Sequence, residues 1–192
     1  MIPKRYSAAI AGATGNMLEW FDFAIYGYFA TALGKVFFPA SDPTLQTIAS
    51  FGIFAIGYLA RPIGSLILGP VGDLLGRRKM MIWSIMIMGV ASFMVALLPS
   101  YAQVGAIAAY ALLFLRMTQG FSIGGEYTGS MVYAAEASPQ GKEGLMSGIA
   151  HAGALLGFFL GSLTAALTAF VFGENAVNDW AWRLPFLLGA LV

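Results

Sequence analysis

The sequence lacks cysteine altogether and has a single histidine in 192 residues. Without cysteine it can form neither a disulfide framework nor a thiolate metal site, and one histidine argues against a histidine-rich metal site. Charged residues make up only 10% of the chain, compared with about 25% in soluble domains. The net charge of +1, without a basic stripe, argues against a nucleic-acid partner.

Apolar residues are correspondingly abundant: they make up 59% of the chain, and the mean hydropathy is +0.78. A chain of this length cannot bury so much apolar surface in a core of its own. We therefore expect it to lie in a bilayer, and its 24 glycines agree, because glycine is more frequent in membrane helices than in soluble ones. The first apolar run is too long for a cleavable signal peptide and carries acids.

The chain divides into apolar runs of about 20 residues or more, the length of a helix that crosses the hydrocarbon. The run 104–134 is too long for one level crossing, so we expect this helix to tilt or to project beyond the membrane. The runs predict an all-α integral membrane protein with about six transmembrane helices, the last of them truncated at Val192. The expected helices cover residues 8–34, 47–71, 80–98, 104–134 and 145–172, and a further one starts near 181.

Basic residues in the links indicate the orientation, because cytoplasmic loops are rich in lysine and arginine. Six basic residues fall on one side of the expected helices and two on the other. We therefore expect the N-terminus and the link around residues 77–79 to face the cytoplasm. The six are Lys4, Arg5, Arg77, Arg78, Lys79 and Lys142, and the two are Lys35 and Arg183.

The sequence GPVGDLLGRRKMM, from Gly69 to Met81, places a dense cluster of charge between two apolar runs. Its basic residues can serve as a topology signal, but an acid adds little to orientation, so Asp73 needs another explanation. Glycines three or four residues apart, here Gly69, Gly72 and Gly76, let another backbone approach closely. We expect this link to pack against another segment and to aim the charge of Asp73 at a partner.

Two acids lie inside the first expected helix, although a charge at the centre of the bilayer costs several kcal/mol. Glu19, Asp22 and Tyr26 are spaced three and four residues apart and so share one helical face, with Asn16 at its edge. One interpretation is that both acids lie near the end of the helix and face water. We favour the other, in which this polar face turns into the bundle interior or into a watery cavity.

Arg61 lies in the second expected helix, about ten residues from the charged link, or roughly 15 Å along a helix. That distance is long for a side chain that snorkels to the interface. Pro62 removes a backbone donor and can kink the helix at this point. Arg61 either takes part in function beside a bend or only neutralises Glu19 or Asp22, and the two interpretations are compatible.

A further set of residues shares one face of the fourth expected helix by helical spacing. Its arginine and its glutamate are about 15 Å apart along the axis and cannot pair with each other. Each needs a partner on another helix, and Glu19, Asp22 and Arg61 are the available ones. The set consists of Arg116, Gln119, Ile123, Glu126, Tyr127 and Ser130.

Glycines recur in the fourth and fifth expected helices, and we interpret them as packing residues, because small residues let helices approach closely. His151 lies on another face of the fifth helix, where it is either a hydrogen-bonded structural group, which we favour, or a proton relay. The glycines are Gly120, Gly124, Gly125 and Gly129 in the fourth helix and Gly153, Gly157 and Gly161 in the fifth.

Enzymatic chemistry is not indicated. No serine has a histidine and an acid beside it in the sequence. The glycine-rich stretch GGEYTG lacks the lysine and the flanking strand of a phosphate-binding loop. We therefore expect neither an enzyme nor a bound cofactor or metal.

Together these motifs resemble the major facilitator superfamily. GPVGDLLGRRK resembles its signature link between the second and third helices, through Gly69, Asp73, Gly76, Arg77 and Arg78. Other stretches narrow the resemblance to the metabolite:proton symporter family, bacterial transporters of organic acids and of zwitterions such as proline and betaine. These stretches are GNMLEWFDFAIYGYF, YLARPIG, RMTQGFSIGGEYTG, EASPQGKEG and DWAWRLPFLLGA.

The resemblance implies a twelve-helix protein of two six-helix halves, with the substrate site between them near the midplane. Residues 1–192 match the first half only, so the second half would be an intramolecular partner. Asp73 would face the N-terminal end of a helix in that half, where the dipole favours an anion, and hold the cytoplasmic gate shut. Leu74 stands where the superfamily usually has a basic residue, which puts one salt bridge of the link in doubt.

The function that we expect is proton-coupled symport of a small carboxylate-bearing solute, an organic acid or a zwitterion, across the bacterial inner membrane by alternating access. Arginine suits the solute site because its guanidinium group matches a carboxylate. The alternative is a membrane receptor or scaffold without flux, or an inactive half-length fragment. The candidates for the proton step are Glu19, Asp22, Glu126 and His151, and those for solute binding are Asn16, Tyr26, Arg61, Arg116 and Gln119.

Overall fold

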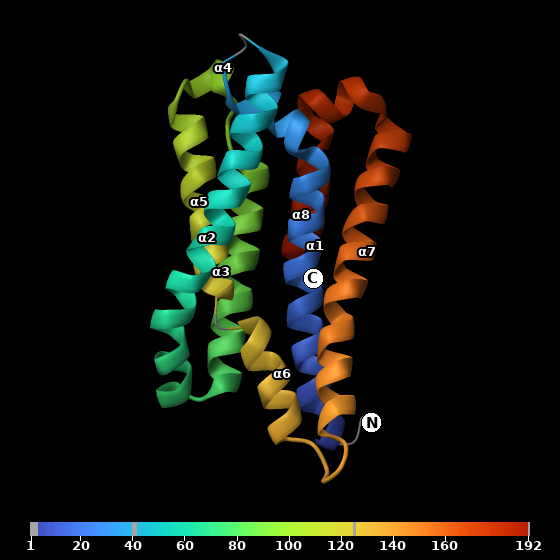
Figure 1. Cartoon of the computed structure of the whole chain (residues 1–192). Helices are drawn as coiled ribbons and strands as arrows, with labels where there is room; N and C mark the ends of the chain where they lie inside the picture. Colours follow the sequence, from blue (N-terminus) through green and yellow to red (C-terminus); the bar gives the residue numbers. More distant parts are fainter. Residues whose placement is uncertain (1–3, 40–41, 125, 192) are drawn as a thin grey trace.

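The computed structural model describes residues 4–39, 42–124 and 126–191. All regular secondary structure in these residues is helical, and the longer helices run alternately up and down a single bundle (Figure 1). The helices are α1 (Lys4–Phe37), α2 (Pro43–Leu75), α3 (Arg77–Leu97), α4 (Tyr101–Val104), α5 (Ile107–Ile123), α6 (Glu126–Glu136), α7 (Glu143–Ala176), the π-helical turn η1 (Val177–Ala181) and α8 (Arg183–Leu191).

Three helical stretches of the described chain are long and apolar enough to cross a membrane: Pro43–Leu75, Arg78–Leu97 and Glu143–Ala181. α1 is also 34 residues long but contains the two acids, Glu19 and Asp22. Much of the outer surface is apolar; Phe170 is 87% exposed and Leu66 78% exposed. Such large apolar patches suit a surface that faces lipid or another membrane segment rather than water.

The expected single helix over 104–134 is wrong, because the structure divides this range into α5 and α6. Before α5, Gly105 adopts a positive φ of 64°, which favours glycine and separates it from the short α4. After α5, the N–H of Gly124 bonds to the carbonyl of Phe121, a tighter bond than the helical ladder uses. In Figure 1, α6 continues below α5 but is displaced sideways toward α1.

The links gather at two ends of the bundle (Figure 1). The start of α1, the α2–α3 link at Gly76 and the α6–α7 link near residues 137–142 lie at the lower end. The α1–α2 link, α4 and η1 lie at the upper end. The basic segments expected on the cytoplasmic side therefore share one end, and that this end faces the cytoplasm stays a prediction.

Glycines make the closest helix contacts, as the sequence predicts. α1 packs along α7, where a Cβ at Gly153 would collide with the backbone of Ala13 and one at Gly157 with the backbone of Met17. Gly161 continues this contact, since a Cβ there would lie 2.7 Å from the carbonyl oxygen of Phe21. The predicted packing seam of α7 is confirmed.

α2 and α5 meet in the same way: a Cβ at Gly120 would collide with the carbonyl oxygen of Gly57, and one at Gly124 with that of Arg61. The packing role predicted for Gly129 is wrong within the described chain, because no described neighbouring atom lies within 4 Å of a Cβ built there. Gly125 lies outside the described residues. These contacts bring α1, α2 and α5 together and so position the polar side chains that they carry.

Candidate functional site

A polar network at the centre of the bundle contains Asp22 and Arg116, although Nη2 of Arg116 has no hydrogen-bond partner among the described residues. Nη1 of Arg116 lies 2.6 Å from Oδ2 of Asp22, and both side chains are 3% exposed. Ser92 donates a hydrogen bond of 2.6 Å to the other carboxylate oxygen, and Gln119 donates a longer one of 3.2 Å. Gln119 in turn accepts from Arg116 at 2.7 Å and donates to Ser92 at 2.8 Å. Four side chains from α1, α3 and α5 thus fix one another in place.

Tyr26, one turn after Asp22 on α1, supports this network. Its ring centroid lies 3.8 Å from Cζ of Arg116, a distance at which the ring face attracts the cation. Its hydroxyl donates a 3.0 Å hydrogen bond to the carbonyl of Ser50, and its side chain is completely buried. Tyr26 therefore holds Arg116 against α2, with its hydroxyl already used inside the bundle.

A second ion pair joins Glu19 of α1 to Arg61 of α2, with Oε1 and Nη1 2.8 Å apart. Glu19 is almost completely buried, and Arg61 is 14% exposed. Neither carboxylate oxygen of Glu19 makes a hydrogen bond to a described residue, nor does Nε of Arg61. The guanidinium group lies over the rings of Phe23 and Tyr58, at 4.1 and 4.5 Å from their centroids. Among the described residues, this pair is held by charge and aromatic faces, whereas Asp22 also accepts hydrogen bonds from Ser92 and Gln119.

Two of the remaining candidates connect α1 or α6 to α7. The amide of Asn16, which is completely buried, donates to the carbonyl of Ala150 at 2.8 Å and accepts from Ser130 at 3.3 Å. Nδ1 of His151 lies 2.7 Å from the hydroxyl of Tyr127, so His151 is hydrogen-bonded, in keeping with the favoured interpretation. Glu126 begins α6, but its side chain lies outside the described part of the chain.

The residues of the charged link lie away from both ion pairs, at the lower end of Figure 1. Gly76 ends α2 with a φ of 94°, which explains a glycine there without any packing. Gly72 is buried, and a Cβ built there would lie 3.4 Å from the side chain of Met80, whereas no neighbouring atom of the described chain lies within 4 Å of one built at Gly69 or Gly76. The packing expected of this link is therefore found at Gly72 only. Asp73 and Arg78 are exposed, and the side chain of Arg77 is outside the described part.

Sequence reasoning missed Ser92 and Ser50, which complete the hydrogen bonding of Asp22 and Tyr26. Both are buried serines in long apolar helices. A hydroxyl in an apolar helix is a signal of a buried partner, but a weak one, because serine can also bond to its own helix.

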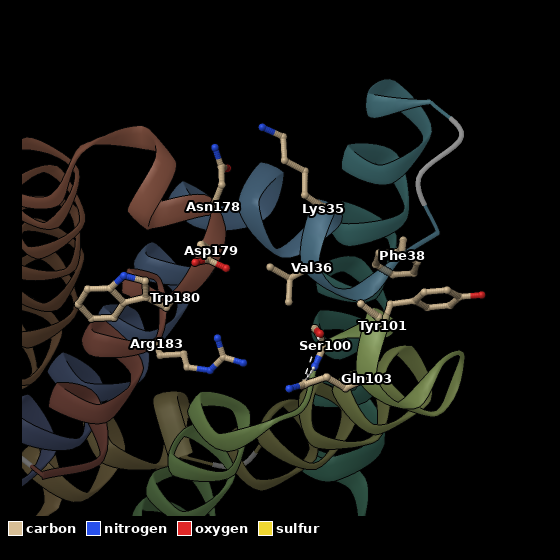
Figure 2. A pocket seen from close by; sticks show the side chains of 11 residues that line it. Lys35, Val36, Phe38, Ser100, Tyr101, Gln103, Asn178, Asp179, Trp180 and Arg183 are labelled. Carbon is tan, nitrogen blue, oxygen red and sulfur yellow. Dashed lines mark hydrogen bonds between the residues drawn. The ribbon is translucent and has the colours of Figure 1, made fainter.

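A separate pocket of about 490 Å³ lies at the upper end of the bundle, between the end of α1, α4 and η1 (Figure 2). Lys35, Asp179 and Arg183 surround it, and Arg183 donates a 2.9 Å hydrogen bond to the carbonyl of Leu98. Figure 2 shows Arg183 extending into the pocket below Asp179. None of the described site candidates lines this pocket, so it is distinct from the ion pairs.

Comparison with protein families shows the family to which the chain belongs. The family described as "Sugar (and other) transporter" matches residues 8–192. The chain belongs to this transporter family. As a member, it is a multi-pass membrane protein of the major facilitator superfamily and not an enzyme, and the resemblance seen in its motifs is confirmed.

Several relatives of this family member are transporters of small solutes by name. The proline/betaine transporter of Salmonella typhimurium is 44% identical over 185 residues, which cover 96% of this chain and 37% of the relative. The glycine betaine/proline/ectoine/pipecolic acid transporter OusA of Dickeya dadantii is 45% identical over 94% of this chain and 36% of its own. The alpha-ketoglutarate permease of Escherichia coli is 35% identical over 98% of this chain and 44% of its own.

The fold of this family member is that of about half of a solved transporter. It matches the proton:xylose symporter XylE, a major facilitator protein, with a TM-score of 0.84 at 17% identity, over 98% of this chain and 43% of that chain. The chain therefore spans less than half the length of the relatives and the solved structure that it matches.

Proposed function

We propose that this chain is the N-terminal half of a symporter that moves a small carboxylate-bearing solute together with a proton by alternating access. The relatives named for proline, betaine and alpha-ketoglutarate support this class of solute, because each of these compounds carries a carboxylate. The observation that carries the proposal is the Glu19–Arg61 pair, a buried carboxylate beside a partly buried guanidinium group, in which Glu19 has no hydrogen-bond partner among the described residues. Intramembrane ionisable residues of this kind mark substrate and proton pathways in transporters.

Glu19 is our candidate for the proton step. A proton can be added to Oε2 of its carboxylate without displacing a donor, since of the two oxygens only Oε1 is paired with Arg61 and Oε2 has no hydrogen-bond partner among the described residues. Asp22 differs, because a proton there would have to displace Arg116, Ser92 or Gln119 from its carboxylate. We assign Asp22 to the frame of the site, while His151 and Glu126 remain secondary candidates.

Arg61 is our candidate for the solute carboxylate. Its guanidinium group has donors to spare, and at 14% exposed it is the more accessible of the two arginines. When Glu19 takes a proton, Arg61 loses its counter-charge and can accept a carboxylate in its place. The proton and the solute then favour each other's binding, which is the linkage that a symporter requires.

The charged link is our candidate for the cytoplasmic gate. Asp73 is exposed near the end of α2, at the same end of the bundle as the basic segments. We propose that it meets the N-terminal end of a helix in the second half when the gate is shut, as the superfamily resemblance implies. The bundle would then lie in the bacterial inner membrane with this end in the cytoplasm.

The test is uptake into proteoliposomes by the full-length transporter under an imposed pH gradient. Labelled glycine betaine, proline and alpha-ketoglutarate are offered in turn, with the interior alkaline. The proposal expects at least one of them to accumulate above its external concentration, and a protonophore to abolish that accumulation. Binding without accumulation of any of the three would leave a receptor or scaffold as the better account.

A further inference from the structure

An aromatic recess of about 450 Å³ lies beside the Glu19–Arg61 pair, on the face formed by α1, α2 and α7. Apart from Ala24 and Gly27, its walls consist entirely of aromatic side chains. No described neighbouring atom lies within 4 Å of a Cβ built at Gly27, so this wall of the recess is open. The aromatic residues are Trp20, Phe23, Tyr28, Phe54, Tyr58 and Phe158.

The recess is continuous with the site, because Phe23 and Tyr58 line it and also lie against the guanidinium group of Arg61. Trp20 extends the same wall toward α6, since its ring centroid lies 6.3 Å from that of Tyr127. The walls are also accessible: Tyr58 is 50% exposed and Phe158 is 49% exposed. One small molecule could therefore place one of its groups in the recess and another on Arg61.

The recess can attract a cation but offers few hydrogen bonds. An aromatic face binds a cation through its quadrupole, and alkylated ammonium groups suit such cages because they have no N–H groups that need acceptors. A second carboxylate would face the negative sides of the rings here and would lose water, with only the indole N–H of Trp20 and the hydroxyls of Tyr28 and Tyr58 as donors in the lining. The chemistry of the recess thus separates zwitterions from dicarboxylates.

We propose that the recess binds the alkylated ammonium group of a zwitterionic solute, whose carboxylate lies on Arg61. This inference rests on the proposed function and narrows its substrate class. The ammonium group among the rings and the carboxylate bound to the guanidinium group of Arg61 would be the opposite ends of one small molecule. Glu19, displaced from Arg61 by the solute carboxylate, is then the group that receives the proton.

The test compares two probes that differ in charge but have nearly the same shape. Trimethylammonioacetate carries the alkylated ammonium group, and 3,3-dimethylbutanoate replaces its nitrogen by carbon. The dissociation constants of both are measured by calorimetry on the purified full-length transporter. The ratio between them isolates the contribution of the cation, because the carboxylate is common to both.

The parent should bind trimethylammonioacetate more tightly than 3,3-dimethylbutanoate, and this preference should fall by roughly 2- to 30-fold in Phe158→Leu and in Trp20→Leu. Trp20→Phe should keep most of it. The matched control is Phe159→Leu on the same helix. Phe159 is 60% exposed and does not line the recess. Phe158 is half exposed, so its truncation is not expected to prevent folding.

Three results would overturn the inference: equal affinity of the parent for both probes, an unchanged preference in Phe158→Leu and Trp20→Leu, or binding of neither probe. Uptake of alpha-ketoglutarate separates these from failure of the proposed function. If the parent accumulates that dicarboxylate under a pH gradient but shows no preference for trimethylammonioacetate, only the zwitterion inference falls. If it accumulates no carboxylate at all, the proposed function falls as well.

Discussion

Asp22 and Arg116 are 94 positions apart in the sequence, yet their side chains meet at 2.6 Å inside the bundle. This contact joins α1 to α5, and Ser92 brings α3 into the same network. The Glu19–Arg61 pair joins α1 to α2 less tightly. The two pairs lie on adjacent turns of α1, so one helix carries both a hydrogen-bonded ion pair and one without hydrogen bonds to the carboxylate from the described residues.

The Asp22 network predicts a large effect on stability. Asp22→Asn leaves Arg116 buried without its counter-charge, and breaking such a pair costs about 3–5 kcal/mol. We expect a clear fall in the thermal unfolding temperature of the purified protein in detergent. Asp22→Asn combined with Arg116→Gln should recover part of the loss, because no buried charge is then left alone. Equal melting of the parent and Asp22→Asn would contradict the structural role of this pair.

The polar residues of the site could be predicted because charge stands out in an apolar helix and helical spacing defines a face. Which helices face each other could not, since spacing on α1 does not say whether Glu19 or Asp22 meets Arg61. The pairing depends on the contacts between backbones at glycines such as Gly57 and Gly120, which are far apart in the sequence. Ser92 was missed for the same reason: its role exists only once α3 lies beside α1.

The end of α5 could not be predicted either. The apolar sequence continues through 104–134, and hydropathy alone therefore predicts one helix. The contact at this end is with another helix, because the backbone of α2 at Arg61 and Ser65 approaches Gly124 too closely for a side chain, and hydropathy carries no information on it. The seam of glycines on α7 was predictable, because its four-residue spacing lies within one helix.

That seam gives a prediction with an internal control. Gly157→Ala would place a methyl group against the backbone of Met17, whereas Gly148→Ala, also on α7, would meet no described neighbouring atom within 4 Å. We expect Gly157→Ala to cost about 1–3 kcal/mol of stability through overpacking and Gly148→Ala to cost little. Thermal unfolding of both variants in detergent measures this, and equal melting temperatures would contradict the close contact of α1 with α7.

The orientation can be measured in the chain as it is, because it contains no cysteine. Gln140 and Ala102 are exposed and lie at opposite ends of the bundle. In spheroplasts, an impermeant maleimide added outside should label Ala102→Cys and leave Gln140→Cys unlabelled until the membrane is opened. The basic asymmetry of the links is the reason for this expectation. The reverse pattern of labelling would show that the N-terminal end faces outward.

The gate proposal concerns Asp73. Replacing it with Asn removes a charge–dipole interaction of about 0.3–1 kcal/mol, or ~2 kcal/mol if it is partly buried. That changes a two-state population several-fold, so Asp73→Asn in the full-length transporter should favour inward-facing states and slow turnover. Cysteine accessibility from the cytoplasmic side reports the population. If both accessibility and uptake match the parent, Asp73 is not a latch.

The central claim, that proton movement depends on Glu19, is tested most directly by comparing accumulation with exchange in Glu19→Gln. The variant is reconstituted as the full-length transporter, and His151→Gln serves as the comparison for the other titratable candidate. We predict that Glu19→Gln exchanges labelled for unlabelled solute across the membrane but no longer concentrates solute when a pH gradient is imposed, while His151→Gln still does. If Glu19→Gln concentrates solute as well as the parent does and His151→Gln does not, the proton step belongs to His151 and the account given for Glu19 and Arg61 is contradicted.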